Sequence, residues 1–280
     1  GAQRGGWWWA QRVLALAIGA AVVAQLAVLP LGHTRASPGR LGLSSGGGWG
    51  WAVETDKGPA PNALLPVPPE VKARWAEPGG GCEARQAVIL PPLAWPPSAL
   101  ASYPGSGNTW CREMLEMASG VVTSSIYNDT GLISAGMHGE GVTMADYART
   151  LLVKTHRGGM GDIAADTWRK AIILVRNPLD AIVSKFHYLT SLSHVDEGSL
   201  DAWIKYKARL QPEASLWAAF FRYWAAPNRK FAHLVLADAP LVVRYEDMRA
   251  DPGYWLKTML DYLGVPVPDH RISCAVATSA

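Results

Sequence analysis

Short apolar runs alternate with longer mixed segments from about residue 99 to the end of the chain. Four of the runs have the length and apolar content of strands that are covered on both faces of a sheet. These predicted strands are Ala99–Tyr103, Leu151–Lys154, Ala171–Val175 and Leu241–Tyr245. The predicted helices between and after them are Thr109–Ala118, Pro178–Leu189, Pro212–Trp224 and Pro252–Leu263. This alternation predicts an α/β domain with three layers, a central parallel sheet flanked by helices.

A different apolar pattern precedes this domain. Residues 13–32 form a run without charged residues that is long enough, as a helix of about 30 Å, to span a bilayer core. Trp7–Trp9 lie where interfacial anchors belong. We therefore predict a transmembrane signal anchor at 13–32 after an N-terminal tail at 1–12, which we expect to be incomplete because it begins with Gly1. A signal peptide cleaved near Ala36 and a buried soluble helix are the alternatives.

The segment between the two patterns has a composition of its own. Residues 33–97 are rich in glycine and proline, which bury little surface and favour an extended spacer. We predict a disordered stem over this range and a folded domain over 98–280. The net charge of +3 gives no reason to expect a nucleic-acid partner. The three cysteines are too few for a disulfide framework and lack metal-site spacing, so we expect no metal.

The first predicted strand leads into a loop with two glycines, Tyr103-Pro104-Gly105-Ser106-Gly107-Asn108-Thr109-Trp110, which enters the first predicted helix. A helix N-terminus presents free backbone N–H groups and about half a positive charge, so it favours a bound anion. Glycine allows the backbone to approach a phosphate closely. Because no Gly-Lys-Ser/Thr closes the loop, it differs from the Walker A loop of nucleotide kinases. The loop predicts a site for another kind of phosphate-bearing donor.

Three further segments carry polar residues at the ends of predicted strands. Lys154 and His156 follow the second strand and would share one face if the strand continues. A cation beside a base suits group transfer from an anionic donor. Arg176 ends the third strand, and Ser184 lies about two helical turns farther on. The planar fork of Arg176 suits a phosphate. The fourth strand ends in Arg244-Tyr245-Glu246-Asp247, for which we expect a structural role in capping the next turn.

Taken in order, these four segments resemble the PAPS-dependent sulfotransferase superfamily, whose donor is 3′-phosphoadenosine 5′-phosphosulfate. The stretch Ala99–Trp110 is most similar to the sulfotransferase domain of WSC domain-containing proteins, although no cysteine-rich WSC module is present. The resemblance covers about Ala99 to Cys274. It implies a P-loop-like fold, and it implies transfer of a sulfuryl group from PAPS to a hydroxyl acceptor, with carbohydrate as the expected acceptor class.

The resemblance also implies roles for individual residues. The 5′-phosphosulfate would be held by Gly105, Ser106, Gly107, Asn108 and Thr109, and Trp110 would flank the adenine. Arg176 and Ser184 would bind the 3′-phosphate. His156 would be the catalytic base, and Lys154 would stabilise charge on the transferring group.

Two departures from the superfamily's pattern bear on these roles. Cytosolic members carry a lysine at the position of Gly105, so here Lys154, Arg112 or the helix dipole would assist the departing phosphate. The superfamily's later basic loop over the 3′-phosphate is absent before Ala280, so we expect the domain at 98–280 to be truncated at its C-terminus.

The resemblance places the protein in the Golgi as a single-pass membrane protein with a luminal domain. Asn128-Asp129-Thr130 is an acceptor pattern for N-glycosylation, which predicts a glycan on Asn128. In an oxidising lumen Cys274 could pair with Cys111 or with Cys82. Two other functions stay open from the sequence: a binding protein that keeps the fold but has lost activity, and a P-loop kinase acting on a small molecule.

Overall fold

The computed structural model describes residues 67–76, 87–91, 97–156, 168, 170–191, 199–225 and 240–279. All of them belong to the unit Pro59–Ala280. The predicted tail at 1–12, the predicted anchor at 13–32 and most of the predicted stem lie outside the described residues. Within the described part of the chain, no helix is both long and apolar enough to cross a membrane.

The centre of the domain is a five-stranded parallel sheet with the order β2-β3-β1-β4-β5. Its strands are β1 (Ala99–Ser102), β2 (Ser124–Ser125), β3 (Val153–Thr155), β4 (Ala171–Val175) and β5 (Leu241–Arg244). The four predicted strands match β1, β3, β4 and β5 within two residues at each end. β2 was not predicted, because two serines give no apolar signal.

The register places the chemically interesting strand ends together. Ala101 pairs with Thr155 of β3 on one side and with Ile173 of β4 on the other, and Val175 pairs with Arg244. Because all strands are parallel, the segments that follow β1, β3, β4 and β5 leave the sheet at the same edge. Ligands of open parallel sheets bind at this edge.

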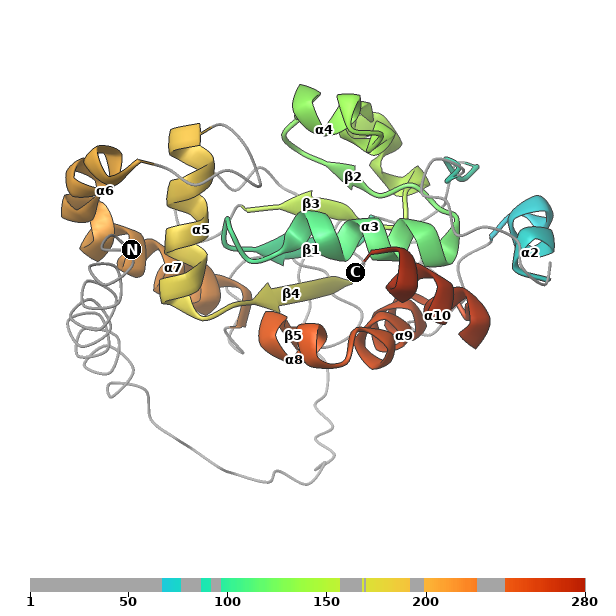
Figure 1. Ribbon diagram of the computed structural model, residues 1–280. Helices are drawn as coiled ribbons and strands as arrows, with labels where there is room; N and C mark the ends of the chain where they lie inside the picture. The colour runs from blue at the N-terminus through green and yellow to red at the C-terminus, as the bar shows by residue number, and fades with distance from the viewer. Residues whose placement is uncertain are drawn as a thin grey trace, which may run out of the picture. The chain divides into compact units, whose positions relative to one another are not determined.

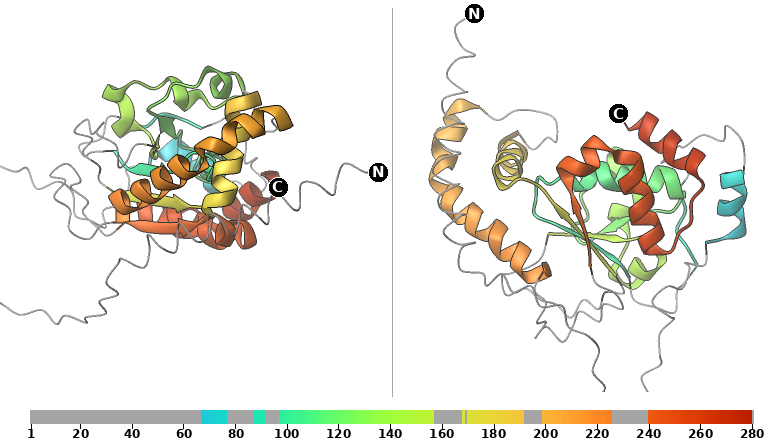
Figure 2. Two further views of the ribbon diagram at one scale, coloured as in Figure 1. Left: turned by 90° about the vertical axis from the view of Figure 1, so that its left-hand side faces the viewer. Right: turned by 90° about the horizontal axis from the view of Figure 1, so that it is seen from below.

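Helices occupy two positions around the sheet (Figures 1 and 2). α3 (Asn108–Ser119), α9 (Pro252–Leu263) and α10 (Asp269–Thr278) pack together on one face. α5 (Pro178–Ser191) lies beyond the strand ends beside α6 (Leu200–Tyr206) and α7 (Leu210–Ala225). The shorter helices are α2 (Pro69–Ala76), α4 (Thr130–Ser134), α8 (Tyr245–Ala250) and the 3₁₀ turns η2 (His138–Gly141), η3 (Met144–Arg149) and η4 (Lys207–Arg209).

The core explains why these elements form. The apolar side chains of β1 and β4 are buried against those of α3 and α9, including Leu100, Ile172, Leu115 and Leu260. Each fully buried aliphatic side chain contributes roughly 1.5–3 kcal/mol. The predicted helices that open with proline begin as expected at α5 and α9, and Gly264 ends α9 in the left-handed conformation at φ 83°.

Two segments within the range predicted as stem are part of this folded domain. Val71 and Trp75 of α2 are buried in the main core cluster, because residues four apart lie on one side of a helix, and Val67 before α2 is buried there too. The Trp75 indole donates a hydrogen bond of 2.9 Å to the Ser119 carbonyl. Val88 forms a parallel bridge with Val121 beyond β2.

Candidate active site

The loop between β1 and α3 is shaped by its two glycines. Gly105 and Gly107 have φ values of 81° and 85°, a backbone conformation that residues other than glycine rarely adopt. A Cβ on Gly105 would lie 2.3 Å from the Ala181 carbonyl oxygen of α5, and a Cβ on Gly107 would lie 2.5 Å from the Tyr245 ring. The loop therefore packs closely against α5 at Gly105 and against Tyr245 at Gly107, with no room for a side chain at either glycine.

Several polar atoms around the loop are buried without a partner. The helix α3 starts at the N-cap Gly107 without a side-chain cap, and its first amides have no carbonyl partner within the helix. Among the described residues, Ser106 Oγ, Asn108 Oδ1 and Arg176 Nε are buried and have no hydrogen-bond partner. An unpaired buried polar atom costs about 1–3 kcal/mol, so this cluster is built for a polar ligand.

A cavity of about 660 Å³ opens beside the loop and collects nearly all the predicted site residues. Those that line it are Gly105, Gly107, Asn108, Thr109, Trp110, Lys154, His156, Arg176 and Ser184. Ser106 is buried beneath the loop instead, 1% exposed. The Trp110 indole donates to the Ser279 carbonyl at 3.2 Å and meets the Tyr245 ring edge-on, so its position at the cavity rim is fixed.

Arg176 connects the end of β4 to the loop. Its Nη1 donates a hydrogen bond of 2.8 Å to the Gly105 carbonyl, and its guanidinium lies 4.5 Å from the centre of the Tyr245 ring. The next residue, Asn177, donates its backbone N–H to Glu246 at 2.8 Å. Arg176 thus holds the loop in place while its Nε is left over for a ligand. Glu246 has a structural contact, but not the predicted one: it accepts from Asn177 before α5, whereas α8, the next helix after β5, has no side-chain cap.

His156 has the geometry of a base. Its Nδ1 lies 2.7 Å from the Ser102 carbonyl, which can only accept a hydrogen bond, so Nδ1 carries the proton and Nε2 keeps a free lone pair. Burial, and then the charge of Lys154, lower the pKa of His156 to about 3. The Tyr127 ring stacks on the imidazole at 5.2 Å, and the Tyr127 hydroxyl accepts the His156 backbone N–H at 2.8 Å. His156 is therefore neutral and oriented at neutral pH.

Lys154 lies on β3 one residue before the strand ends. Its side chain is buried, and its ammonium sits 5.8 Å from the centre of the Tyr127 ring. Burial, and then the neighbouring Arg112, lower the pKa of Lys154. Because β3 pairs directly with β1, Lys154 and His156 flank the loop from one side, while Arg176 flanks it from the other. The arrangement can neutralise an anion between two cations and remove a proton next to it.

The sequence matches the family model of the sulfotransferase domain over residues 96–279. The chain belongs to the sulfotransferase family. It is 35% identical over 182 residues to a WSCD family member of Aedes aegypti and 34% identical over 183 residues to one of Drosophila melanogaster. Each match covers 64% of this chain, and the chain spans about half (54%) of the length of these relatives. These similarities agree with the resemblance found in the motifs.

More distant matches include further sulfotransferases and a retinol dehydratase. Sulfotransferase 1A1 of Rattus norvegicus is 26% identical over 196 residues, which is 65% of each chain. Among solved structures, a mouse sulfotransferase complexed with PAP shares 20% identity with a TM-score of 0.45, covering 68% of this chain and 65% of that one. A retinol dehydratase in complex with androsterone and PAP shares 18% identity with a TM-score of 0.44, covering 65% and 64%.

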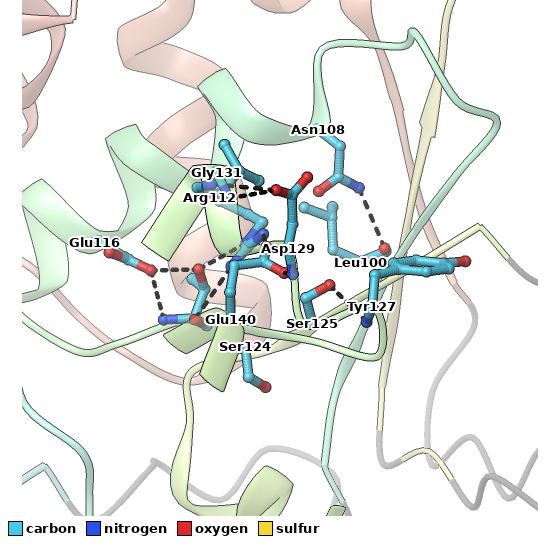
Figure 3. A network of polar contacts seen from close by, with 12 residues as sticks. Leu100, Asn108, Arg112, Glu116, Ser124, Ser125, Tyr127, Asp129, Gly131 and Glu140 are labelled. Carbon is cyan, nitrogen blue, oxygen red and sulfur yellow. Dashed lines mark hydrogen bonds and ion pairs between the residues drawn. The ribbon is translucent and has the colours of Figure 1, made fainter. Parts of the chain in front are cut away.

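Arg112, one of the candidates to assist the departing phosphate, has a structural role instead. Arg112 was a candidate cation for the departing phosphate, but its side chain is completely buried away from the cavity. It is ion-paired with Glu140 and donates to Thr123 Oγ1 at 2.8 Å and to the Thr123 carbonyl at 3.3 Å. Figure 3 shows this network, in which Glu116 receives hydrogen bonds from the same threonine. Arg112 is structural because its charge is already neutralised.

The structure gives the disulfide state of two of the three cysteines. Cys274 is disulfide-bonded. Cys111 is a free, buried thiol, and burial raises its pKa to about 12. The pairing of Cys274 with Cys111 that the sequence allowed is therefore wrong, because α3 buries Cys111 in the core. Cys82, the other predicted partner, lies outside the described residues.

The cavity also contains residues that the motifs did not reveal. Tyr127, Asp129, Lys185 and Tyr188 line it together with the predicted residues. Tyr127 and Asp129 flank Asn128, which is exposed with a φ of 52°. No group of His, Cys, Asp or Glu among the described residues could hold a metal ion. Asn-Asp in a loop and a lysine after Ser184 are too common in sequences to stand out before the fold brings them together.

Proposed function

We propose that this chain is an enzyme that transfers a sulfuryl group from PAPS to a hydroxyl group of a glycan. The observation that carries the proposal is the position of His156, whose free Nε2 shares one cavity with the unpaired polar atoms of the loop. Family membership supports the reaction class, and the PAP in solved relatives supports the donor. The lack of a lysine in the loop speaks against a P-loop kinase.

The unpaired groups fit the donor. The α3 amides, Ser106 and Thr109 would hold the 5′-phosphosulfate, and Gly105 and Gly107 leave its oxygens close to backbone. Arg176 Nε and Ser184 would hold the 3′-phosphate, and Trp110 at the rim would flank the adenine. Of these groups, Ser106 Oγ and Arg176 Nε have no partner among the described residues, and Thr109, Trp110 and Ser184 line the cavity.

The reaction would proceed by in-line displacement. The acceptor oxygen attacks sulfur and loses its proton to His156 Nε2, while the bond between sulfur and the 5′-phosphate oxygen breaks and PAP leaves. Lys154 would stabilise the negative charge on the sulfuryl oxygens. A positioned base contributes roughly 100-fold or more in rate, and a preorganised donor about 3 kcal/mol.

A glycan acceptor is supported by the mouth of the cavity. Tyr127 and Tyr188 are 43% and 36% exposed, and both line the cavity with Asp129. Exposed tyrosines offer an apolar face and a polar tip, and a carboxylate accepts hydrogen bonds from sugar hydroxyls. This combination suits a polyhydroxylated ring better than a wholly apolar acceptor.

The decisive experiment compares His156→Ala with the matched control His270→Ala, since His270 is an exposed histidine of α10. Both variants and the wild type receive labelled PAPS and a panel of glycans. We expect His156→Ala to lower transfer at least 100-fold, with PAP affinity in calorimetry changed less than about twofold. The control should behave as wild type. Unchanged turnover in His156→Ala would remove His156 as the base, and PAPS that fails to bind the wild type would remove the function.

We also propose that residues 13–32 anchor the protein in the Golgi membrane with this domain in the lumen. The apolar run supports the anchor, and the disulfide at Cys274 supports an oxidising compartment. The exposure of Asn128 supports a glycan there. In cells, the protein should run faster on a gel after glycosidase treatment, and Asn128→Gln should abolish that shift. A wild-type protein without any shift would count against the luminal placement.

A further inference from the structure

The donor loop itself carries no positive side chain. Gly105, Ser106, Gly107, Asn108 and Thr109 are uncharged. A side chain at Gly105 is impossible without rearrangement, because its Cβ would lie 2.3 Å from the Ala181 carbonyl oxygen and 2.9 Å from the backbone nitrogen of Lys185. The charge that develops on a departing phosphate oxygen nevertheless needs a nearby cation or donor. A cation for this role would lie on an element packed against the loop, and α5 packs against it at Gly105.

Three cations line the cavity among the described residues: Lys154, Arg176 and Lys185. Arg176 is already used by the Gly105 carbonyl and the Tyr245 ring. Lys154 lies on β3 beside His156, on the side where the proposed reaction places the acceptor. Lys185 follows Ser184 on α5, and a Cβ on Gly105 would lie only 2.9 Å from its backbone nitrogen. Of the three cations, Lys185 therefore belongs to the element that packs against the loop at Gly105, where a charged loop side chain is missing.

The Lys185 ammonium is held at the base of the loop. Its Nζ lies 2.7 Å from Glu213 Oε2 on α7 and 3.4 Å from the hydroxyl of Tyr103, the second residue before Gly105. Tyr103 also donates a hydrogen bond to Glu213, and the ammonium lies 5.1 Å from the centre of its ring. Two of the three ammonium N–H groups are thus used in described contacts, which leaves one for a ligand oxygen.

The burial of this trio argues that it serves more than stability. The side chains of Lys185 and Glu213 are only 19% and 5% exposed. A buried ion pair stabilises a fold no better than apolar residues of similar size, because both charges lose their hydration. Burial raises the pKa of Glu213, but the hydrogen bonds from Lys185 and Tyr103 outweigh it and lower that pKa overall. Glu213 therefore stays ionised, with its carboxylate held 2.7 Å from the Lys185 ammonium.

We propose that Lys185 is the cation that α5 supplies to the 5′-phosphosulfate in place of a charged loop side chain, and that Glu213 and Tyr103 hold its ammonium in readiness. This inference rests on the proposed function. In the reaction, Lys185 donates a hydrogen bond to the 5′-phosphate oxygen as its bond to sulfur breaks. Glu213 and Tyr103 are positioning residues, since they act through Lys185. The charge of Lys185 also helps to lower the pKa of His156, which places both groups in one electrostatic site.

The test separates the two phosphate positions of the donor. We would measure binding of PAP, of adenosine 5′-phosphosulfate and of adenosine 3′-phosphate to Lys185→Met, Lys185→Arg and the exposed control Lys205→Met. Lys185→Met should weaken PAP and adenosine 5′-phosphosulfate about tenfold or more, and leave adenosine 3′-phosphate within about twofold. Lys185→Arg should restore most of the affinity, and Lys205→Met should match wild type. Equal losses for all three ligands, or no loss for any, would overturn the proposal.

A double variant separates a loss of ligand binding from a loss of stability. Lys185→Met leaves Glu213 buried without its cation, so we would add Glu213→Gln and measure thermal unfolding. The double variant should be as stable as wild type and should bind 5′-phosphate ligands as weakly as Lys185→Met does. Recovery of both stability and binding would show that Lys185 is only structural. If the binding pattern holds but wild type transfers nothing from PAPS, the proposed reaction fails while the role of Lys185 in donor binding stands.

Discussion

Two buried polar regions lie one helical turn apart on α3, and they differ in a single respect. Around Arg112, charged groups are matched: the guanidinium is paired with Glu140 and Thr123, and Thr123 in turn donates to Glu116. Around Asn108, the loop keeps buried atoms without partners among the described residues. In the first region the polar groups pair with other protein groups and stabilise the fold, and in the second region unpaired groups are available to a ligand. Burial alone therefore does not identify a site, whereas several buried and unpaired polar atoms gathered at one loop point to one.

Breaking the matched region should give the largest effect. Arg112→Met leaves Glu140 buried and unpaired, which we expect to lower the free energy of unfolding by about 3–5 kcal/mol. Urea denaturation measures the loss. The control is Lys257→Met, which removes the surface pair with Asp269 and should leave the midpoint unchanged. A small loss in Arg112→Met would mean that the network is not what holds α3 to η2.

Gly105 tests how tightly the loop is wedged. Gly105→Ala meets both the strain of a φ of 81° and the 2.3 Å contact with Ala181, so we expect a loss of about 2–4 kcal/mol together with weak PAP binding. Gly136→Ala is the matched control, because Gly136 has a φ of 100° but nothing within 4 Å of a Cβ. It should lose only about 1 kcal/mol. Equal losses in both variants would show that the contact with α5 does not matter.

Ser106 should respond in the opposite sense to Arg112. Ser106→Ala removes a buried hydroxyl that has no described partner, so stability should stay level or rise by about 1 kcal/mol. PAP affinity should fall about tenfold, because one hydrogen bond to the 5′-phosphate is lost. Chemical denaturation and calorimetry on the same sample separate the two effects. A destabilised variant with normal PAP affinity would reverse the assignment of this region.

The last effect, confined to acid conditions, is a dependence of stability on pH. The pKa of His156 is about 3 in the folded chain and about 6.5 when unfolded. Between these values only the unfolded chain binds a proton there, so stability falls as the pH is lowered, by at most about 1.4 kcal/mol per unit. Urea midpoints at pH 7 and pH 5 should therefore differ less in His156→Asn than in wild type. An equal difference in both would mean that His156 is protonated in the folded state as well.

The contrast also shows what sequence can reveal. The apolar runs of β1, β3, β4 and β5 and the loop before α3 were predictable, because a covered strand and a glycine turn leave local patterns. β2 was not, since its serines are buried by their neighbours and show no period. Lys185 was missed for a related reason. Its partners Glu213 and Tyr103 lie 28 and 82 residues away in sequence, and only the packing of α5 against the loop and α7 brings them together.

A structure of the protein with PAP tests the central claim most directly, because it shows whether the unpaired atoms are the donor site. We predict the 5′-phosphate within about 3.2 Å of Ser106 Oγ and the first amides of α3, and the 3′-phosphate within the same distance of Arg176 and Ser184. PAP bound elsewhere, with Ser106 Oγ and Arg176 Nε still unpaired, would contradict the account.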